Sequence, residues 1–122
     1  MTEFSGVRVL IVEDEFTVAM MIEDALEALG CEIVSSASRI AQARDIAEAG
    51  DIDVAVLDVN VAGTPVFPIA QILHERQIPF LFSTGYGAGS VPDEFSGYEL
   101  VGKPFSESEL TRKLSLTLKG AQ

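Results

Sequence analysis

Four apolar segments of this 122-residue sequence each end at polar side chains of types that can do chemistry. If the segments are parallel strands, their carboxyl ends meet at one edge of a sheet, which is where ligands bind in such folds. The first segment is followed by an acidic run, the second by an aspartate and an asparagine, the third by two hydroxyls and the fourth by a lysine. In chain order these residues are Glu13, Asp14, Glu15, Asp58, Asn60, Ser83, Thr84 and Lys103.

Gathered at one edge, these side chains would form a metal-dependent site for phosphoryl transfer. Carboxylate oxygens from separate strands suit a hard cation such as Mg²⁺ or Mn²⁺. Such a cation also offsets the repulsion by which neighbouring carboxylates raise one another's pKa. The Thr84 hydroxyl and the Lys103 ammonium would bind phosphoryl oxygens. Asp58 would then be the nucleophile and form an acyl phosphate.

Each of these residues also has a simpler interpretation. The acids at 13–15 precede a helical pattern and would cap the helix. Thr84 alone is typical of a turn, and Lys103, which precedes Pro104, is typical of a solvated loop. The coincidence of four complementary groups at one sheet edge favours the phosphoryl-transfer site.

The elements that must position these residues alternate between strands and helices. Strands are predicted at 7–12, 31–36, 54–58, 78–83 and 98–102, where short apolar runs rich in β-branched and aromatic residues occur. Helical spacing of apolar residues predicts a helix that ends at Gly30, one over 39–50, one that opens at Pro65 and one over 106–120. Ser106 and Glu109 form a capping-box pattern at the start of the last helix.

The connection over 84–97 is the exception, because it contains four glycines and a proline. These residues are poor helix formers, so we expect a short or irregular helix there. Five β-then-α units predict an α/β fold in three layers, with a parallel five-stranded sheet between helices. No linker or composition shift divides residues 1–122, so we expect a single domain and no output domain.

Composition narrows the function classes. The formal net charge of −11 repels phosphate backbones and argues against binding to nucleic acid. No apolar run approaches the ~20 residues that span a bilayer, and the start of the sequence lacks the basic region of a signal peptide. The single cysteine, Cys31, fits a reducing compartment. We expect a cytoplasmic monomer that does not bind membranes.

The motifs VLIVEDE, VAVLDVNV, STG and GKPF, in this order, resemble the receiver domain of two-component response regulators along essentially the whole chain. The resemblance implies a flavodoxin-like (βα)5 fold with strand order 2-1-3-4-5. It implies that Asp58 is the phosphoacceptor and that Mg²⁺ is bound by Asp14, Asp58 and the backbone carbonyl of Asn60. Its other implied roles are a water-mediated contact for Glu13, a switch hydroxyl at Thr84, the conserved-type lysine at Lys103 and a cis bond before Pro104.

The stretch PFLFSTGYG resembles a group of receivers with a Phe-Ala-Thr-Gly-(x)-aromatic motif. Here Ser83 stands for the alanine, Gly85 follows the threonine and Tyr86 is the aromatic residue. Members of that group are mostly alphaproteobacterial, are often stand-alone and are often paired with histidine kinases of the HWE or a related type. The resemblance therefore implies a bacterial signalling protein and a kinase of that kind as its partner.

One position departs from the receiver pattern. Most receivers carry Tyr or Phe three residues before the lysine, and that ring turns inward when the threonine binds the phosphoryl group. This chain has Leu100 there, so the usual coupling cannot operate through that side chain. We expect instead that the glycine-rich segment 85–97 becomes ordered on phosphorylation, with Tyr86 as a candidate moving ring.

The leading interpretation is a response regulator that accepts a phosphoryl group from a histidine kinase or a histidine phosphotransfer protein. It would signal through protein contacts, or serve as a phosphate relay or sink, and it would catalyse only its own phosphorylation and dephosphorylation. The alternative is a phosphatase or phosphotransferase of the haloacid-dehalogenase type. That class carries its nucleophile on the first strand in a D-x-D pattern, whereas Asp58 lies on the third and the residue two positions later is Asn60. A nucleotide-binding module is disfavoured because no G-x-G-x-x-G follows the first strand.

Overall fold

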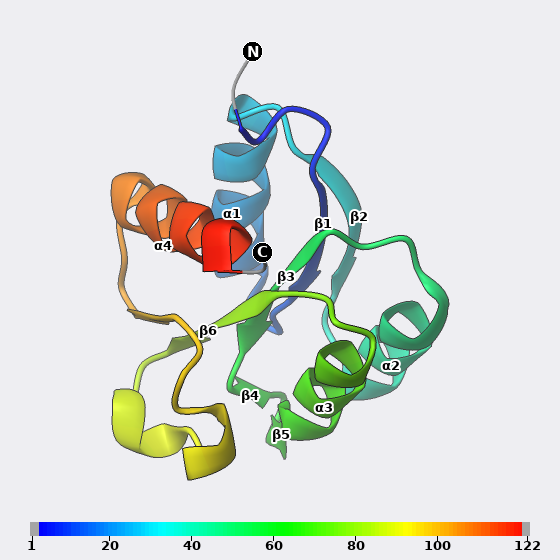
Figure 1. Ribbon diagram of the computed structural model, residues 1–122. Coiled ribbons are helices and arrows are strands. Elements are labelled where there is room, and N and C mark those ends of the chain that lie inside the picture. Colours follow the sequence, from blue (N-terminus) through cyan, green and yellow to red (C-terminus); the bar gives the residue numbers. More distant parts are fainter. Residues whose placement is uncertain (1–2, 121–122) are drawn as a thin grey trace.

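A five-stranded parallel sheet runs through the middle of the computed structural model, which describes residues 3–120 (Figure 1). Its strands lie in the order β2-β1-β3-β6-β7, which is 2-1-3-4-5 when they are ranked along the sequence. The predicted flavodoxin-like fold and strand order are therefore confirmed. The strands are β1 (Arg8–Val12), β2 (Glu32–Ala37), β3 (Val54–Asp58), β6 (Phe80–Thr84) and β7 (Leu100–Gly102).

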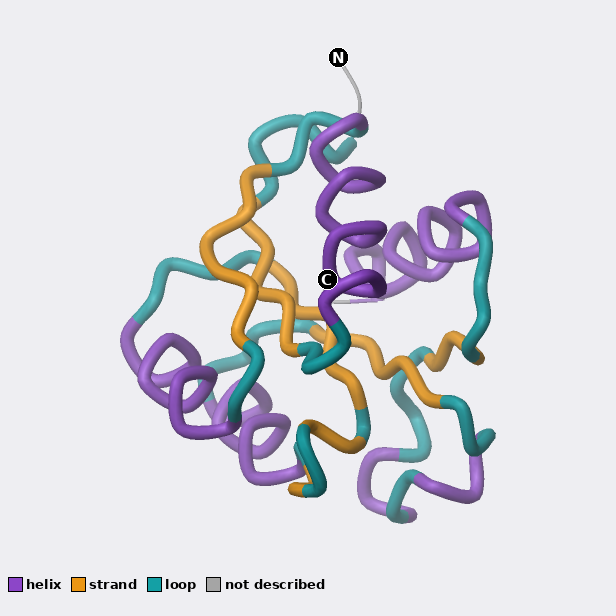
Figure 2. The backbone as a smooth tube through the Cα atoms, turned by 180° about the vertical axis from the view of Figure 1, so that it is seen from behind, coloured by secondary structure: helices purple, strands orange, loops and turns teal. Residues whose placement is uncertain are grey.

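Two α-helices cover each face of the sheet, as both views of the backbone show (Figures 1 and 2). Helices α1 (Phe16–Ala28) and α4 (Glu107–Gly120) bury Ile22, Leu26, Leu110 and Leu114 against one face. Helices α2 (Ile40–Ala49) and α3 (Phe67–Glu75) pack against the other face with small and aliphatic residues. Because both faces are covered, no residue of β3 is exposed, as expected for a central parallel strand.

The alternation of side chains along each strand decides which layer a residue faces. In β3, Ala55 and Leu57 join the core under α2 and α3, while Val54 and Val56 join the core under α1 and α4. Asp58, the last residue of β3, therefore falls on the α1 and α4 side of the sheet. Glu13 and Lys103 continue the ladders of β1 and β7 through backbone hydrogen bonds to Ala37 and Thr84.

The fourth connection contains only two short 3₁₀ helices, η1 (Ala88–Ser90) and η2 (Asp93–Phe95). The predicted short or irregular helix is thus confirmed. Figure 2 shows this segment as a compact double bend in the place of a full helix. Phe95 is buried in the core under α3 and anchors the segment.

The region after Asp58 differs from the prediction, because Pro65 does not open a helix. Asn60–Val61 and Thr64–Pro65 form a small antiparallel hairpin, β4 and β5, and α3 begins at Phe67. Ala62 and Gly63 have positive φ angles of 51° and 85°, which is the backbone shape of a tight two-residue hairpin turn. The proline of the first helical turn is Pro68.

The last helix begins as predicted, since the Ser106 hydroxyl accepts a hydrogen bond from the backbone N–H of Glu109 at 3.1 Å.

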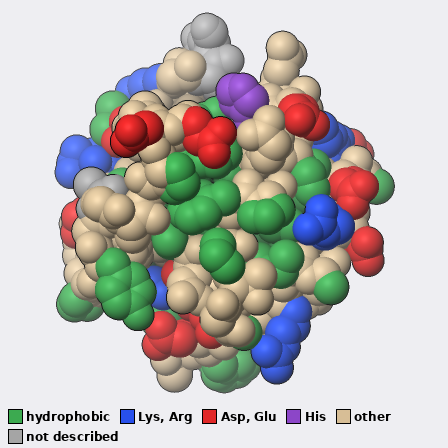
Figure 3. Space-filling model, turned by 90° about the horizontal axis from the view of Figure 1, so that it is seen from below, with side chains coloured by type: hydrophobic (Ala, Val, Ile, Leu, Met, Phe, Trp, Pro, Cys, Tyr) green, Lys and Arg blue, Asp and Glu red, His purple; other side chains and the backbone are tan. Residues whose placement is uncertain are grey.

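Hydrophobic side chains gather in the middle of the lower surface of the molecule (Figure 3). Among residues 3–120, no helix has the length and the apolar content needed to cross a bilayer.

A forked contact joins the start of β1 to the residue before β3. The Asp53 carboxylate accepts the backbone N–H of Arg8 at 2.8 Å and two guanidinium N–H groups at 3.1 Å each. These hydrogen bonds from Arg8 outweigh partial burial and lower the pKa of Asp53. The contact therefore stabilises the fold when Asp53 is ionised.

We predict that Asp53→Asn lowers the urea midpoint at pH 7, because the charged fork to Arg8 is lost. The folded-state pKa of Asp53 lies below its unfolded value, so the wild-type advantage is complete above about pH 5 and disappears as pH falls below about 3. Asp51→Asn is the matched control, since the Asp51 side chain is 89% exposed and lies 3.4 Å from the Arg8 guanidinium. Equal midpoints for the two variants at pH 7 would contradict the assigned role.

Candidate functional site

Three carboxylates meet at the carboxyl edge of the sheet. Oxygen atoms of Glu13, Asp14 and Asp58 all lie within 4.8 Å of one another. Glu13 is only 2% exposed and Asp58 6%, whereas Asp14 is open to solvent. The strand ends that bring them together are those of β1 and β3, which are neighbours in the sheet. The predicted acidic cluster is therefore present.

A single lysine faces this cluster. The Lys103 ammonium lies 2.8 Å from Oε1 of Glu13, 3.4 Å from Oδ2 of Asp58 and 3.5 Å from Oε1 of Glu15. Within residues 3–120, no other cationic side chain lies within 4.0 Å of these carboxylates. The peptide bond between Lys103 and Pro104 is cis, as the family resemblance implied.

The charges at the site shift the pKa of its members in different directions. Burial and the repulsion of Glu13 raise the pKa of Asp58 to about 7, against the opposing attraction of Lys103. Burial also acts to lower the pKa of Lys103, but its pairing with Glu13 and Asp58 outweighs burial and raises it. Asp58 is thus a carboxyl group that the protein alone does not fully stabilise as an anion.

Asp14 behaves differently from Asp58. Its partial burial acts to raise its pKa, but several hydrogen bonds together outweigh burial and lower the pKa. The largest of these contributions comes from the backbone N–H of Ala62, which donates to Oδ2 at 3.0 Å. Asp14 is therefore an exposed anion at the rim of the site, held by the turn of the β4–β5 hairpin. An ionised carboxylate beside two buried ones is a donor set that fits a divalent cation with several water ligands.

Asn60 lies beside Asp58 at the start of the hairpin. Its backbone N–H points to Oδ1 of Asp58 at 3.4 Å, and its side-chain Oδ1 accepts the N–H of Gly63 at 2.9 Å. The amide side chain is thus engaged in the turn. A role for the backbone carbonyl of Asn60 at the site stays a prediction.

Thr84 reaches the same sheet edge but does not contact the acidic cluster. Its hydroxyl accepts the backbone N–H of Tyr86 at 3.0 Å and lies 3.2 Å from the Ser90 hydroxyl, which donates to the carbonyl of Gly87 at 2.6 Å. The threonine is therefore tied to the glycine-rich segment. Ser90 was not among the predicted site residues, because no motif marks a contact between a turn hydroxyl and a residue six positions earlier.

Neither of the predicted switch positions places an aromatic ring in the core. Leu100 is half-buried against the core under α3, and the Tyr86 side chain is 78% exposed. Ser83 is fully buried beside Asp58, and its hydroxyl has no hydrogen-bond partner among the described residues.

The alternative interpretation of the acids at 13–15 as helix caps is not supported. Glu15 occupies the N-cap position of α1, but its side chain makes no capping hydrogen bond. The Glu13 carboxylate accepts the backbone N–H of Glu15 through Oε2 at 3.1 Å, while Oε1 faces Lys103. Glu13 and Glu15 therefore face Lys103 instead of capping the helix.

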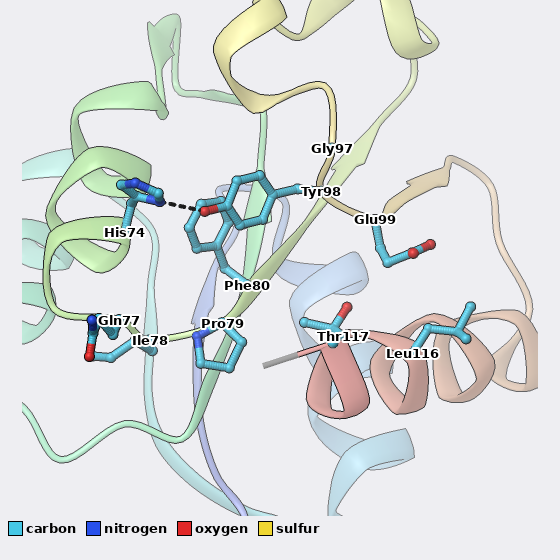
Figure 4. A pocket seen from close by; sticks show the side chains of 11 residues that line it. His74, Gln77, Ile78, Pro79, Phe80, Gly97, Tyr98, Glu99, Leu116 and Thr117 are labelled. Carbon is cyan, nitrogen blue, oxygen red and sulfur yellow. Dashed lines mark hydrogen bonds between the residues drawn. The ribbon is translucent and has the colours of Figure 1, made fainter. Parts of the chain in front are cut away.

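A separate hollow lies at the opposite edge of the sheet (Figure 4). It has a volume of about 540 Å³ and lies where β6 and β7 begin, beside the ends of α3 and α4. His74 and Tyr98 are joined across it by a hydrogen bond of 2.6 Å. The hollow lies at the amino ends of β6 and β7, whereas the acids lie at the carboxyl ends of β1 and β3. It is therefore not part of the acidic site.

Comparisons with known proteins agree with the geometry. Residues 9–115 match the model of the family described as the response regulator receiver domain. The solution structure of SdrG from Sphingomonas melonis Fr1 has a TM-score of 0.83 and 39% identity over 93% of this chain and 97% of that one. A solution structure of the BeF3-activated conformation of SdrG from Pseudomonas melonis Fr1 has a TM-score of 0.79, again at 39% identity, over 93% and 98% of the two chains.

Curated relatives include the transcriptional regulatory protein TcrA of Mycobacterium tuberculosis, which is 32% identical over 90% of this chain and 45% of its own length. The chain thus spans about half the length of the curated relatives it matches.

We predict that Asp58→Asn stabilises the metal-free protein at pH 8. The folded-state pKa of Asp58 lies above its unfolded value, so its ionisation opposes folding above about pH 4. The free energy of unfolding should rise by about 1–2 kcal/mol above pH 7. This is less than the full shift implies, because the asparagine amide is itself a buried polar group that needs hydrogen-bond partners. The gain should vanish near pH 4. Urea unfolding in EDTA measures it.

The same variant gives a control for the metal. Adding Mg²⁺ should raise the urea midpoint of the wild type and raise that of Asp58→Asn much less, because one ligand is lost. A wild-type midpoint that does not respond to Mg²⁺ would contradict the shared acidic site.

Proposed function

The chain belongs to the response regulator receiver domain family, and on this basis we propose that it is a phosphorylation-controlled signalling protein with Asp58 as the phosphoacceptor. The observation that carries the proposal is the geometry around Asp58. Its carboxylate is nearly buried, shares a lysine with Glu13 and is repelled by Glu13. A carboxylate that is held in place but incompletely stabilised is suited to attack a phosphorus atom.

The proposed reaction divides the work among residues of the chain. An oxygen of Asp58 forms a bond to phosphorus, and the bond from phosphorus to the donor's leaving group breaks. Lys103, which already lies 3.4 Å from Asp58, neutralises charge on the phosphoryl oxygens. The Thr84 hydroxyl, at the same sheet edge, donates a hydrogen bond to the phosphoryl group after it releases the N–H of Tyr86.

Mg²⁺ or Mn²⁺ would be held by the carboxylates of Asp14 and Asp58 and by the backbone carbonyl of Asn60, with Glu13 acting through water. When bound, the cation supplies positive charge that offsets both the crowded carboxylates and the incoming phosphoryl group. The cluster of Glu13, Asp14 and Asp58 oxygens supports this assignment.

The proposed phosphoryl donor is a histidine kinase, of the HWE or a related type, or a histidine phosphotransfer protein. Large apolar side chains flank the site and remain exposed, namely Phe16 at the start of α1 and Tyr86 after Thr84. Met20, one helical turn from Phe16, is also exposed. Such a surface beside a reactive carboxylate supports docking of another protein.

The proposed readout uses the glycine-rich segment at 85–97. In the structure the Thr84 hydroxyl is held by Tyr86 and Ser90 of this segment. In the proposed readout, Thr84 turns to a phosphoryl oxygen and releases Tyr86 and Ser90. The released segment then becomes ordered through new contacts around the phosphorylated site. The partner that reads this change is a protein, since the net charge of −11 disfavours nucleic acid.

We predict that the protein incubated with Mg²⁺ and acetyl phosphate gains one acid-stable, base-labile phosphoryl group, and that Asp58→Asn gains none. Mass spectrometry measures the added mass, and Asp51→Asn, an exposed acid near the other end of β3, should behave as the wild type. Labelling that persists in Asp58→Asn would contradict the assigned acceptor. Sustained turnover of an external phosphomonoester would instead support the haloacid-dehalogenase alternative. Phosphotransfer profiling with candidate kinases then identifies the donor.

We predict that beryllofluoride with Mg²⁺ raises the NMR order parameters of backbone amides in 85–97. Without metal or beryllofluoride, the same amides should have lower order parameters in Ser90→Ala than in the wild type, because the hydrogen bonds from Ser90 to Thr84 and Gly87 are lost. Ser96→Ala is the control, since Ser96 lies in the same segment and the Thr84 contacts do not involve it. Order parameters that do not change on activation of the wild type would contradict the proposed readout.

A further inference from the structure

Ser83 is a buried hydroxyl that the proposed phosphoacceptor role does not yet use. It is 1% exposed, and its Oγ atom has no hydrogen-bond partner among the described residues. A buried hydroxyl without a partner costs about 1–3 kcal/mol relative to a satisfied one. Alanine would fill the same space without this cost, so the structure gives no reason of stability for a serine here.

The sheet places Ser83 beside the acceptor carboxylate. Ser83 is paired in register with Asp58 across β3 and β6. Leu81, two residues earlier on β6, faces the core under α1 and α4. By the alternation of strand side chains, Ser83 faces the same layer as Asp58.

Lys103 has to pass over β6, the strand that carries Ser83, to reach the acids. Lys103 follows β7, at the sheet edge, whereas the carboxylates it contacts end β3 and β1. Strand β6 lies between β7 and β3, and Ser83 is its last residue on this side of the sheet. Neighbouring strands lie about 4.8 Å apart, so the lysine side chain has to pass over β6 to bring its ammonium to Asp58.

Taken together, the unpartnered hydroxyl and the crossing lysine point to one role. We propose that Ser83 is a positioning residue of the phosphoryl site, whose hydroxyl accepts a hydrogen bond from the Lys103 ammonium when that ammonium leaves Glu13 for a phosphoryl group on Asp58. In the unphosphorylated protein the ammonium is held by Glu13 at 2.8 Å, and the serine hydroxyl stays unpaired. Phosphorylation then satisfies it.

The role of Ser83 goes beyond the proposed acceptor function and rests on it. An ammonium has three N–H donors, and a hydroxyl acceptor beneath it would fix the direction of the remaining two. Hydrogen bonds to charged groups are stronger than neutral ones. Ser83 would therefore favour the state in which Lys103 contacts the phosphoryl group, and so strengthen binding of phosphoryl mimics and slow their loss.

The test compares Ser83→Ala with Ser83→Thr, which keeps the hydroxyl, in the full 122-residue chain. Ser83→Ala should match or exceed the wild-type urea midpoint in EDTA, because an unpaired hydroxyl is removed. It should bind beryllofluoride with Mg²⁺ about tenfold more weakly and lose its phosphoryl group faster by a similar factor. Ser83→Thr should restore most of the affinity. Thr117→Val, which removes another buried hydroxyl far from the site, is the control and should leave affinity unchanged.

A second readout follows the lysine itself. The ¹⁵N-labelled ammonium of Lys103 should give a slowly exchanging NMR signal with beryllofluoride in the wild type and a broadened one in Ser83→Ala. Wild-type affinity and an unchanged Lys103 signal in Ser83→Ala would overturn the role of Ser83 alone. A lower urea midpoint in Ser83→Ala with no rescue by threonine would assign Ser83 to packing only. A wild type that does not bind beryllofluoride would overturn both this inference and the proposed function.

Discussion

The crowding of negative charge at one sheet edge is the constraint on which the rest of the structure depends. Glu13 and Asp58 are buried, Asp14 lies beside them, and one ammonium faces the group. Burying a carboxylate is costly unless it is paired, and one lysine cannot pair fully with several acids. The protein therefore holds Asp58 with a pKa raised to about 7. In the proposed function this crowding has a use, because it would favour a bound cation and keep Asp58 reactive.

The parallel sheet, which is covered on both faces, stabilises the fold enough to tolerate these buried charges. The strands that carry the acids contribute eight buried apolar residues, which are Val9, Leu10, Ile11, Val12, Val54, Ala55, Val56 and Leu57. Burial of this surface, at about 25 cal/mol per Å², stabilises the fold by more than the buried carboxylates destabilise it. The alternation of side chains along the strands then places Asp58 and Ser83 on the side of the sheet that α1 and α4 cover.

Local patterns were enough to predict most of the fold and the centre of the site. The β-branched runs identified the strands, and the polar residues that follow them identified Glu13, Asp14, Asp58 and Lys103. The hairpin was missed because it depends on Ala62 adopting a positive φ, which alanine rarely does and no local pattern signals. The tie between Thr84 and Ser90 was missed because it depends on how the glycine-rich segment folds back. Ser83 was predicted at the sheet edge, but its missing hydrogen-bond partner was not, because that is a property of the packed core.

The proposed readout rests on a comparison of the free energy needed to move an aromatic ring with that needed to move the glycine-rich segment. Leu100 borders a core in which Phe80, Phe82, Phe95 and Tyr98 contact one another with ring centroids 4.1–6.3 Å apart. Displacing one of these rings would lose packing worth about 3–5 kcal/mol. The hydrogen bonds that tie Thr84 to Tyr86 and Ser90 are each worth about 0.5–1.5 kcal/mol net, and in the proposed readout they would be exchanged for a bond to a charged phosphoryl oxygen. With leucine in place of the usual ring, this difference in free energy favours the proposed route from Thr84 into the glycine-rich segment over one through the aromatic core.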